Sequence, residues 1–209
     1  MDGVRAPRQK RGQASFERLL DVAEEVLAEE GYAGLTIAAL RARGISNGAI
    51  YWRVDSMESL FVAVHERFLK RVADEHGAYA DAARWEGLDL AEFVARSVRV
   101  EASVFERHAG FLRTLVLHAG IDEASNERGA RAVRDEARRF VDHVAPRLHN
   151  DGVRAPEATA TAVFRVVFGA LLTRIAWPEH QGGGADPPWE GFVDQLCEMA
   201  ASYVVARRT

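Results

Sequence analysis

Hydrophobic residues recur at every third or fourth position along most of this chain, and polar residues fill the positions between them. That spacing places the apolar side chains on one face of an α-helix. No segment shows the strict alternation of a half-buried β-strand. We therefore predict an all-α fold of about nine helices. The predicted helices cover residues 15–31, 36–44, 47–53, 56–76, 89–108, 111–118, 124–148, 156–177 and 189–207.

These helices divide the chain into three parts. Residues 1–14 form a flexible basic arm, residues 15–54 a helix-turn-helix domain, and residues 55–209 a larger helical body. Pro7 and Gly12 discourage a helix in the arm. Its charged side chains are Arg5, Arg8, Lys10 and Arg11 against Asp2, a net charge of +3. Such an arm can follow DNA phosphates or enter a minor groove, and the alternative is a solvated tail.

Two short helices joined by a tight turn are predicted after the first long helix. Thr36 and Ser46 are good N-caps, because their hydroxyl groups can accept orphan backbone N–H groups. Gly44 suits a helix end that needs a left-handed backbone. Ile45 and Ile50 face inward at helical spacing. The layout is that of a helix-turn-helix, which presents the N-terminal end of its second helix to the DNA major groove.

The charge of this segment favours the same interpretation. The 24 positions between Glu30 and Asp55 hold no acidic residue. The basic residues there are Arg41, Arg43 and Arg53, which give +3 in a chain of formal net charge -4. A surface that faces phosphates is expected to lack acids in this way.

Composition narrows the class of protein. Apolar residues at 48% and charged residues at 28% are ordinary for a globular protein. The single cysteine, Cys197, excludes an intramolecular disulfide and fits a reducing cytoplasm, and the N-terminus has no signal-peptide pattern. Residues 158–177 are long enough to span a bilayer but contain Arg165 and Arg174, which are costly inside a membrane. We predict a cytoplasmic protein without a membrane span.

Motifs for catalysis are incomplete throughout the chain. His65-Glu66 lacks the second histidine of a zinc-protease helix, and no Glu-x-x-His occurs for a di-iron site. The Gly182–Gly184 run has no Lys-Ser/Thr after it, so it is no phosphate loop. We expect no enzyme activity, no metal and no cofactor.

The order of residues from Gly44 to Trp52 is a specific signature: Gly, Ile, Ser, Asn, Gly, Ala, Ile, Tyr, Trp. Further matching residues are Phe16, Ala23, Leu27, Gly31, Tyr32, Leu35, Thr36, Leu60 and Phe61. On these residues the N-terminal 60 or so positions resemble the TetR family of bacterial transcriptional regulators. The rest of the chain is similar to that family in helix number and length.

The resemblance implies a three-helix DNA-binding head and a role for each matching residue. Thr36 would hold a phosphate, residues 47–49 would face base edges, and Tyr51 and Trp52 would lie along the DNA backbone or over a thymine methyl. Asparagine can also bond adenine bidentately, and Ala49 can contact a thymine methyl. For Tyr51 and Trp52 the alternative is core packing. The predicted DNA-contacting residues are Thr36, Arg43, Ser46, Asn47, Gly48, Ala49, Tyr51, Trp52 and Arg53.

Two departures from the family pattern leave a second function open. Met57 occupies a position where family members commonly have a lysine, so one phosphate anchor is missing. The segment from Thr36 to Gly44 is one residue short, and Arg41 stands where a small apolar residue is expected. Arg43 and the other arginines can replace the missing cation. Otherwise the chain is an all-α small-molecule binding or catalytic protein whose helix-turn-helix no longer reads DNA specifically.

The body is predicted to dimerise and to bind an effector. Residues 158–177 are apolar nearly all round, so they and residues 189–207 are expected to form a homodimer interface or, alternatively, a buried core. The resemblance implies a pocket for a small, largely apolar ligand that releases a repressor from a pseudo-palindromic operator in double-stranded DNA. The candidate pocket residues, which core packing would explain equally, are Phe105, Phe111, His118, Phe140, His143, Phe164 and Phe168.

Overall fold

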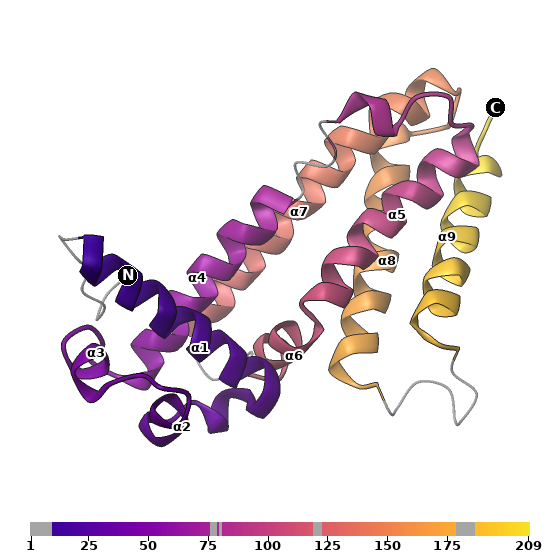
Figure 1. Ribbon diagram of the computed structural model, residues 1–209. Helices are drawn as coiled ribbons and strands as arrows, with labels where there is room; N and C mark the ends of the chain where they lie inside the picture. Colours follow the sequence, from indigo (N-terminus) through magenta and orange to yellow (C-terminus); the bar gives the residue numbers. More distant parts are fainter. Residues whose placement is uncertain (1–9, 76–78, 80, 119–122, 179–186) are drawn as a thin grey trace. The chain divides into compact units, whose positions relative to one another are not determined.

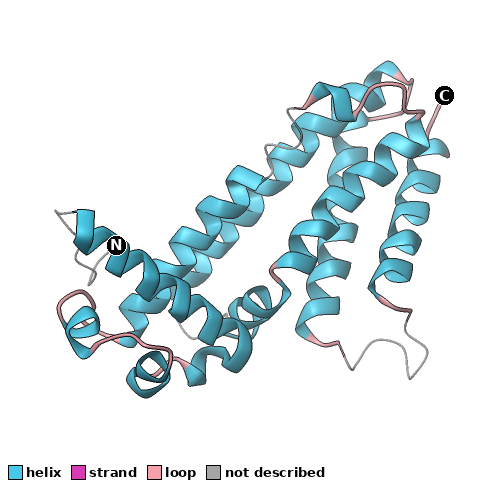
Figure 2. Ribbon diagram, viewed as in Figure 1, coloured by secondary structure: helices cyan, strands magenta, loops and turns pink. Residues whose placement is uncertain are grey.

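The computed structural model describes residues 10–75, 79, 81–118, 123–178 and 187–209 of the 209-residue chain. These residues form nine α-helices, which confirms the predicted all-α class (Figures 1 and 2). The helices are α1 Lys10–Gly34, α2 Ile37–Ala42, α3 Asn47–Tyr51, α4 Met57–Glu75, α5 Leu90–Arg107, α6 Ala109–His118, α7 Glu123–Asn150, α8 Pro156–Ala176 and α9 Trp189–Val205. A short 3₁₀-helix, η2, covers Ala82–Arg84.

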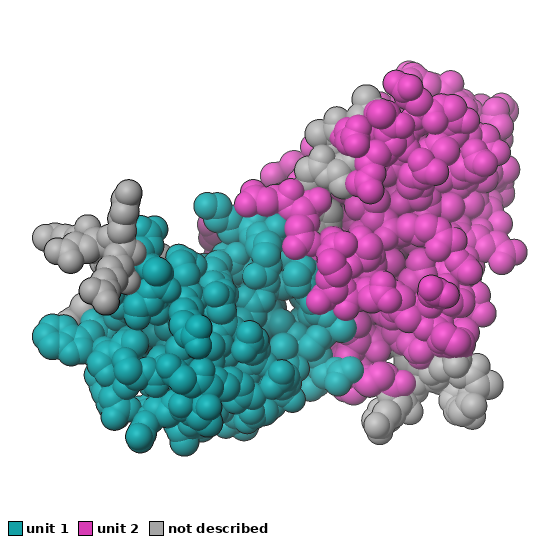
Figure 3. Space-filling model, viewed as in Figure 1, with its two compact units in different colours: residues 1–72, 108–126 teal, residues 73–107, 127–209 magenta. Residues whose placement is uncertain are grey.

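The chain separates into two compact units (Figure 3). Unit 1 comprises residues 1–72 and 108–126, and unit 2 comprises residues 73–107 and 127–209. The boundary differs from the predicted division after residue 54, because most of α4 and all of α6 join the helix-turn-helix. Residues 1–9 of the predicted basic arm lie outside the described part of the chain. Helix α1 begins at Lys10, five residues before the expected start at Ser15.

Unit 1 is built on the apolar face of α1. Leu19, Ala23, Val26 and Leu27 on this helix are fully buried, as their i, i+3, i+4 spacing predicts. Gly31 has a φ of 71°, a left-handed backbone that ends the regular helix at the predicted residue. The core is completed by buried side chains of the four other helices and their turns: Leu35, Leu40, Ile45, Ile50, Val54, Leu60, Phe61, Val64, Phe68 and Phe111.

Helix α6 packs closely on α1 within unit 1. A Cβ atom at Gly110 would lie 2.7 Å from the backbone oxygen of Ala28, so only glycine permits this approach. The Thr114 hydroxyl donates a hydrogen bond of 2.6 Å to the Leu27 carbonyl. His118 stacks on Tyr32 with ring centroids 3.7 Å apart. A segment distant in sequence therefore belongs to the helix-turn-helix unit.

Unit 2 is organised around α5, against which both α8 and α9 pack. Its buried side chains include Phe93, Val94, Val98, Ala102 and Phe105, which follow one face of the helix. Near the C-terminus, residue Val153 pairs with Arg208 in an isolated antiparallel bridge, which ties the end of the chain to the turn between α7 and α8.

Helix α8 is the most apolar element of unit 2. In the described residues it is the one helix that is long and apolar enough to cross a membrane, by length and composition alone. A core helix passes the same test, and its buried residues, among them Val163, Val167 and Leu171, face unit 2. On the opposite side of the helix, Val166 is 59% exposed, and Ala162 and Gly169 are only partly buried in the protomer.

Candidate nucleic-acid interface

Helices α2 and α3 begin at the capping residues that the sequence indicates. The Thr36 hydroxyl accepts a hydrogen bond of 3.1 Å from the Ala39 N–H, and the Ser46 hydroxyl accepts one of 3.2 Å from the Ala49 N–H. Gly44 has a φ of 85°, which turns the chain between the two helices. Both helices, labelled in Figure 1, belong to unit 1. The local chemistry thus fixes where each helix starts and how they are joined.

One side of the turn holds the two helices to the core. Leu40, Ile45 and Ile50 are buried, and Ala49 is partly buried against the same core. These contacts fix α3 by its inner face, so its other face is available to a partner. Of the predicted base-facing residues, Asn47 and Gly48 are exposed.

Two large aromatic side chains stand exposed at the end of α3. Tyr51 is 65% exposed and Trp52 is 77% exposed, so neither side chain packs in the core, which was the alternative interpretation. Large aromatic side chains are normally well buried, and their exposure in one place is a mark of a binding surface. With Asn47 and Gly48 they form the recognition face, a name used below for these four residues.

The predicted cations of this region have partners in the structure. The Arg43 guanidinium donates to Glu29 at 2.8 Å and to Glu30 at 2.7 Å. These hydrogen bonds, first the one to Glu30, raise the pKa of Arg43 above its usual value. Arg53 lies over the Phe16 ring, 6.0 Å from its centroid. The sequence pattern did not reveal these contacts, because they join α1 to a segment that is distant along the chain.

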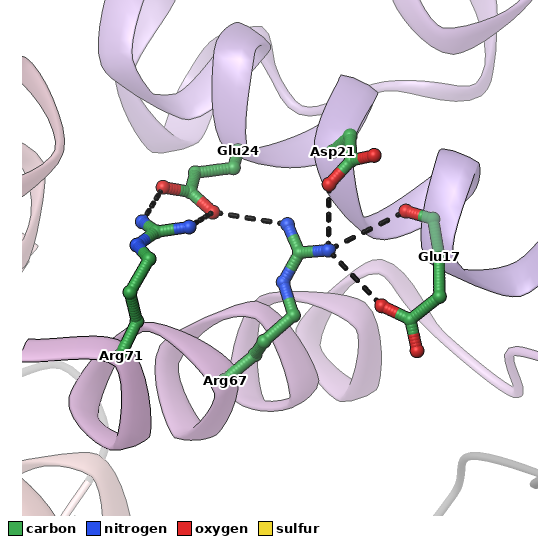
Figure 4. A network of polar contacts seen from close by, with 5 residues as sticks. All are labelled: Glu17, Asp21, Glu24, Arg67 and Arg71. Carbon is green, nitrogen blue, oxygen red and sulfur yellow. Dashed lines mark hydrogen bonds and ion pairs between the residues drawn. The ribbon is translucent and has the colours of Figure 1, made fainter. Parts of the chain in front are cut away.

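A network of ion pairs fastens α4 to α1 (Figure 4). Arg67 donates to Asp21 at 2.7 Å and to Glu24 at 3.0 Å, and reaches Glu17 at 3.4 Å. Arg71 pairs with the same Glu24 carboxylate. Burial lowers the pKa of Arg67, but its hydrogen bonds to Asp21 and Glu24 outweigh burial and raise it. The acidic face of α1 is therefore the side that holds α4.

The seven predicted effector-pocket residues fall into three groups. In unit 2, Phe105, Phe140, Phe164 and Phe168 form a ring cluster with neighbouring centroids 5.2 Å to 5.6 Å apart. His143 belongs to another aromatic cluster in unit 2. Phe111 and His118 lie in unit 1, where they pack on Phe68 and Tyr32.

The cluster around His143 contains residues that sequence reasoning missed. The His143 ring stacks on Tyr79 with centroids 4.5 Å apart, and its centroid lies 4.2 Å from that of the Trp85 ring. The Tyr79 hydroxyl donates to the buried Glu101 carboxylate, and burial raises the pKa of Tyr79. Burial also lowers the pKa of His143 to about 4. Tyr79 and Trp85 stand in an irregular stretch between helices, where periodicity carries no signal.

Metal chemistry has no candidate in the described residues. No group of three or more histidine, cysteine, aspartate or glutamate side chains there could hold a metal ion. Cys197 is buried and donates to the Ala95 carbonyl at 3.3 Å, and burial raises its thiol pKa. A raised pKa leaves little thiolate, so the side chain has the character of a core residue.

Comparison with known proteins places the recognition face in a family domain. Residues 19–64 match the family model described as bacterial regulatory proteins, tetR family. The match begins in α1, includes α2 and α3 and ends in α4, so it covers the elements that carry and support the recognition face. No curated protein sequence matches the chain.

Several solved structures share the fold over nearly the whole chain. A transcriptional regulator from Saccharomonospora viridis in complex with choline has a TM-score of 0.69 at 14% identity, covering 92% of this chain and 96% of that one. A transcriptional regulator from Cytophaga hutchinsonii has a TM-score of 0.68 at 14% identity, covering 92% and 98%. A TetR-like transcriptional regulator from Rhodococcus sp. RHA1 has a TM-score of 0.62 at 22% identity, covering 97% and 99%. At these identities the likeness shows the fold.

Proposed function

Because the N-terminal domain of this chain is that of the TetR family of bacterial transcriptional regulators, we propose that the protein is a dimeric repressor whose hold on DNA is controlled by a small molecule. The observation that carries this proposal is the recognition face: polar Asn47 and small Gly48 beside exposed Tyr51 and Trp52, on a helix held by its other side. This face fits a major groove, into which an α-helix can enter.

The proposed contacts are of two kinds: those to phosphates position the protein on the DNA, and those to bases read its sequence. Thr36 and Ser46 stand at helix starts, where backbone N–H groups and a hydroxyl can meet phosphate oxygens. Asn47 offers a bidentate bond to adenine. The predicted contact of Ala49 with a thymine methyl competes with the packing of that side chain against the core. Gly48 permits close approach of the α3 backbone. Tyr51 and Trp52 supply apolar contact with the sugar-phosphate backbone or a thymine methyl.

In this proposal Arg43 leaves Glu29 and Glu30 when DNA binds and contacts a phosphate instead. Glu29 and Glu30 are both exposed, so water and salt weaken their attraction for the guanidinium. A DNA phosphate offers Arg43 the same bidentate geometry as a carboxylate. Arg53, stacked near Phe16, and the exposed Arg41 add positive charge at the same end of unit 1 and can replace the lysine absent at Met57.

The dimer forms through α8 and α9. The exposed face of α8 carries Ala162, Val166, Gly169 and Thr173 at spacings of four, three and four, and Val166 is 59% exposed. Nothing lies within 4 Å of a Cβ placed on Gly169. On α9 the exposed Met199 and Tyr203 form a matching apolar face. Pairing these helices with their copies gives a four-helix bundle and covers the open apolar side of α8. That cover accounts for an apolar helix in a cytoplasmic protein.

The effector site is placed in unit 2, at the ring cluster of Phe105, Phe140, Phe164 and Phe168. These rings come from three helices, α5, α7 and α8, so a ligand among them changes how the helices pack. The similar structure from Saccharomonospora viridis holds choline, which shows that a protein of this fold binds a small molecule. A ligand releases DNA when it binds the DNA-incompetent state more tightly.

Selection from a random DNA pool at several salt concentrations tests the function. A specific regulator enriches a pseudo-palindrome whose half-sites are about one or more helical turns apart, and the complex survives salt that removes non-specific binding. Loss of all binding preference with tight uptake of an apolar ligand would instead establish the alternative, a small-molecule binding or catalytic protein with a degenerate helix-turn-helix.

A further inference from the structure

Unit 2 has a surface pocket of about 360 Å³ on the outer side of α5, and none of the four phenylalanines of the ring cluster is in its described lining. Its described lining is Arg84, Trp85, Arg96, Arg99, Val100 and Ser103. Three of these six side chains are guanidinium groups and none is acidic. A concentration of positive charge in a hollow is notable in a chain whose formal net charge is -4.

The pocket is built from two adjoining segments. Arg96, Arg99, Val100 and Ser103 follow α5 at spacings of three, one and three, which places them on one face, opposite the buried residues of that helix. Residues 84 and 85 form the facing wall at the end of η2. Arg96 donates to the backbone oxygen of Arg84 at 2.5 Å and so ties the two walls together.

The three arginines retain donors for a ligand. The Arg84 guanidinium makes no hydrogen bond or ion pair with the described residues, and Arg96 uses one nitrogen on a carbonyl. Arg99 pairs with Asp194 at 2.6 Å, but both side chains are more than half exposed. Such an exposed pair is weak, so an incoming anion can replace the Asp194 carboxylate. A guanidinium group can donate two parallel hydrogen bonds to the two oxygens of a carboxylate or phosphate, which an ammonium group cannot do.

Trp85 and Val100 give the pocket an apolar side. Trp85 is partly buried, with its ring 4.2 Å from His143 and 5.4 Å from Phe93 on the inner side of the segment. These contacts hold the indole in place at the pocket wall. A rigid aromatic wall beside convergent charged groups is the composition of a small-molecule site, and the volume suits a ligand of mononucleotide or aromatic-acid size.

We propose that this pocket binds an organic anion, whose carboxylate or phosphate lies among Arg84, Arg96 and Arg99 while its flat body lies against Trp85. The site is separate from the ring cluster, and it does not depend on the reading of DNA. In the proposed dimer it stays open, because Asp194, which pairs with the pocket's Arg99, lies on the opposite side of α9 from Met199 and Tyr203.

Isothermal titration calorimetry on the full-length protein tests the proposal with two matched pairs of probes. AMP and 2-naphthoate carry the anionic group, and adenosine and 2-naphthamide are their neutral counterparts. At least one anion is expected to bind with a Kd below about 1 mM, and its neutral counterpart at least tenfold more weakly. Binding of AMP alone identifies phosphate as the group recognised, and binding of 2-naphthoate alone identifies carboxylate.

Arginine variants locate the site. Arg84→Gln and Arg96→Gln are each expected to weaken binding of the anion tenfold or more, and either one suffices if the other fails to fold. Arg131→Gln is the control, because Arg131 is an exposed arginine of unit 2 that pairs with Glu127 away from the pocket. Absence of binding by both anions, equal binding of the neutral probes, or equal losses in all three variants would overturn the proposal.

Discussion

At the scale of single residues, the exposed aromatic pair of α3 is a feature that folding alone does not explain. Tyr51 and Trp52 leave most of their surface in water, whereas the neighbouring Ile50 is buried. Burial of apolar surface lowers the free energy, and an exposed side chain has this stabilisation only when a partner covers it. The pair therefore contributes little to the stability of the folded protomer, and in the proposed function it stabilises the complex with DNA.

Tyr51→Ala is expected to weaken DNA binding by about tenfold or more while the protein keeps its stability within about 0.5 kcal/mol. Fluorescence anisotropy with the selected operator measures the affinity, and thermal unfolding measures the fold. Ile50→Ala is the contrasting change, since loss of a buried side chain costs about 2–5 kcal/mol. A Tyr51→Ala protein that binds the operator as well as the original would remove Tyr51 from the interface.

Gly110 gives a second test at this scale. In Gly110→Ala the new methyl group meets the Ala28 backbone oxygen, which cannot move aside as a flexible side chain could. We expect a loss of about 1–3 kcal/mol in the free energy of unfolding. Gly129→Ala is the matched control, because the helix α7 has open space there and alanine is expected to add about 0.5–1 kcal/mol. Urea unfolding should show opposite signs, and equal signs would contradict the close approach.

His143 makes the stability of unit 2 depend on pH. Its pKa in the folded state is about 4, below the ordinary value of 6.5, so the unfolded chain binds the proton more readily. The stabilising contribution is complete above pH 6.5 and is lost as the pH falls towards 4. His143→Gln is expected to reduce the loss between pH 7 and pH 5 by about 1 kcal/mol, after allowance for solvent screening. Unfolding curves of equal pH dependence would refute this.

At the scale of elements, unit 1 is held together by charge as well as by its core. Arg67 is 21% exposed and contacts three carboxylates of α1, whereas Arg99 and its single partner Asp194 are exposed. Hydrogen bonds to charged groups contribute more when they are shielded from water. The first network should therefore matter for stability and the second pair should not.

Arg67→Met is expected to lower the free energy of unfolding by about 1–3 kcal/mol, because Glu24 is then left partly buried with fewer donors. Arg99→Met, which removes a surface pair of similar length, is expected to change it by no more than about 0.5 kcal/mol. Chemical denaturation of both variants provides the comparison. Similar losses in the free energy of unfolding would show that the α1–α4 network stabilises the protein no more than the exposed Arg99–Asp194 pair does.

The elements themselves could be predicted from the sequence, and their partners could not. Local signals such as the Ser46 cap and the left-handed glycine at Gly44 act over a few residues, so most helix positions followed directly, although α1 begins at Lys10 and not at Ser15. His118 was a candidate lining residue of the effector pocket, and the structure shows it stacked on Tyr32 in unit 1. That placement depends on the return of α6 to α1, a long-range contact that periodicity does not encode. For the same reason the Arg43 pairing with Glu29 was not foreseen.

At the scale of the whole molecule, the proposed function requires two recognition faces at a fixed spacing. A pseudo-palindromic site presents its half-sites by two-fold symmetry, and a symmetric dimer matches it. In the proposed dimer, the apolar face of α8 around Val166 supplies this symmetry. Because each substitution in a symmetric interface occurs twice, one charged residue there should be enough to separate the protomers.

Val166→Glu is expected to give a folded monomer. Val166 is 59% exposed in the protomer, so the change leaves the core intact but places a charge in the proposed interface, where its desolvation is costly. Val133→Glu on α7 is the control, since Val133 is also partly exposed but lies outside α8 and α9. Sedimentation should show a dimer for the control and a monomer for Val166→Glu. The monomer should lose affinity for a two-half-site operator and keep that for a single half-site, because only the first requires both heads. A Val166→Glu dimer of undiminished affinity would place the interface elsewhere.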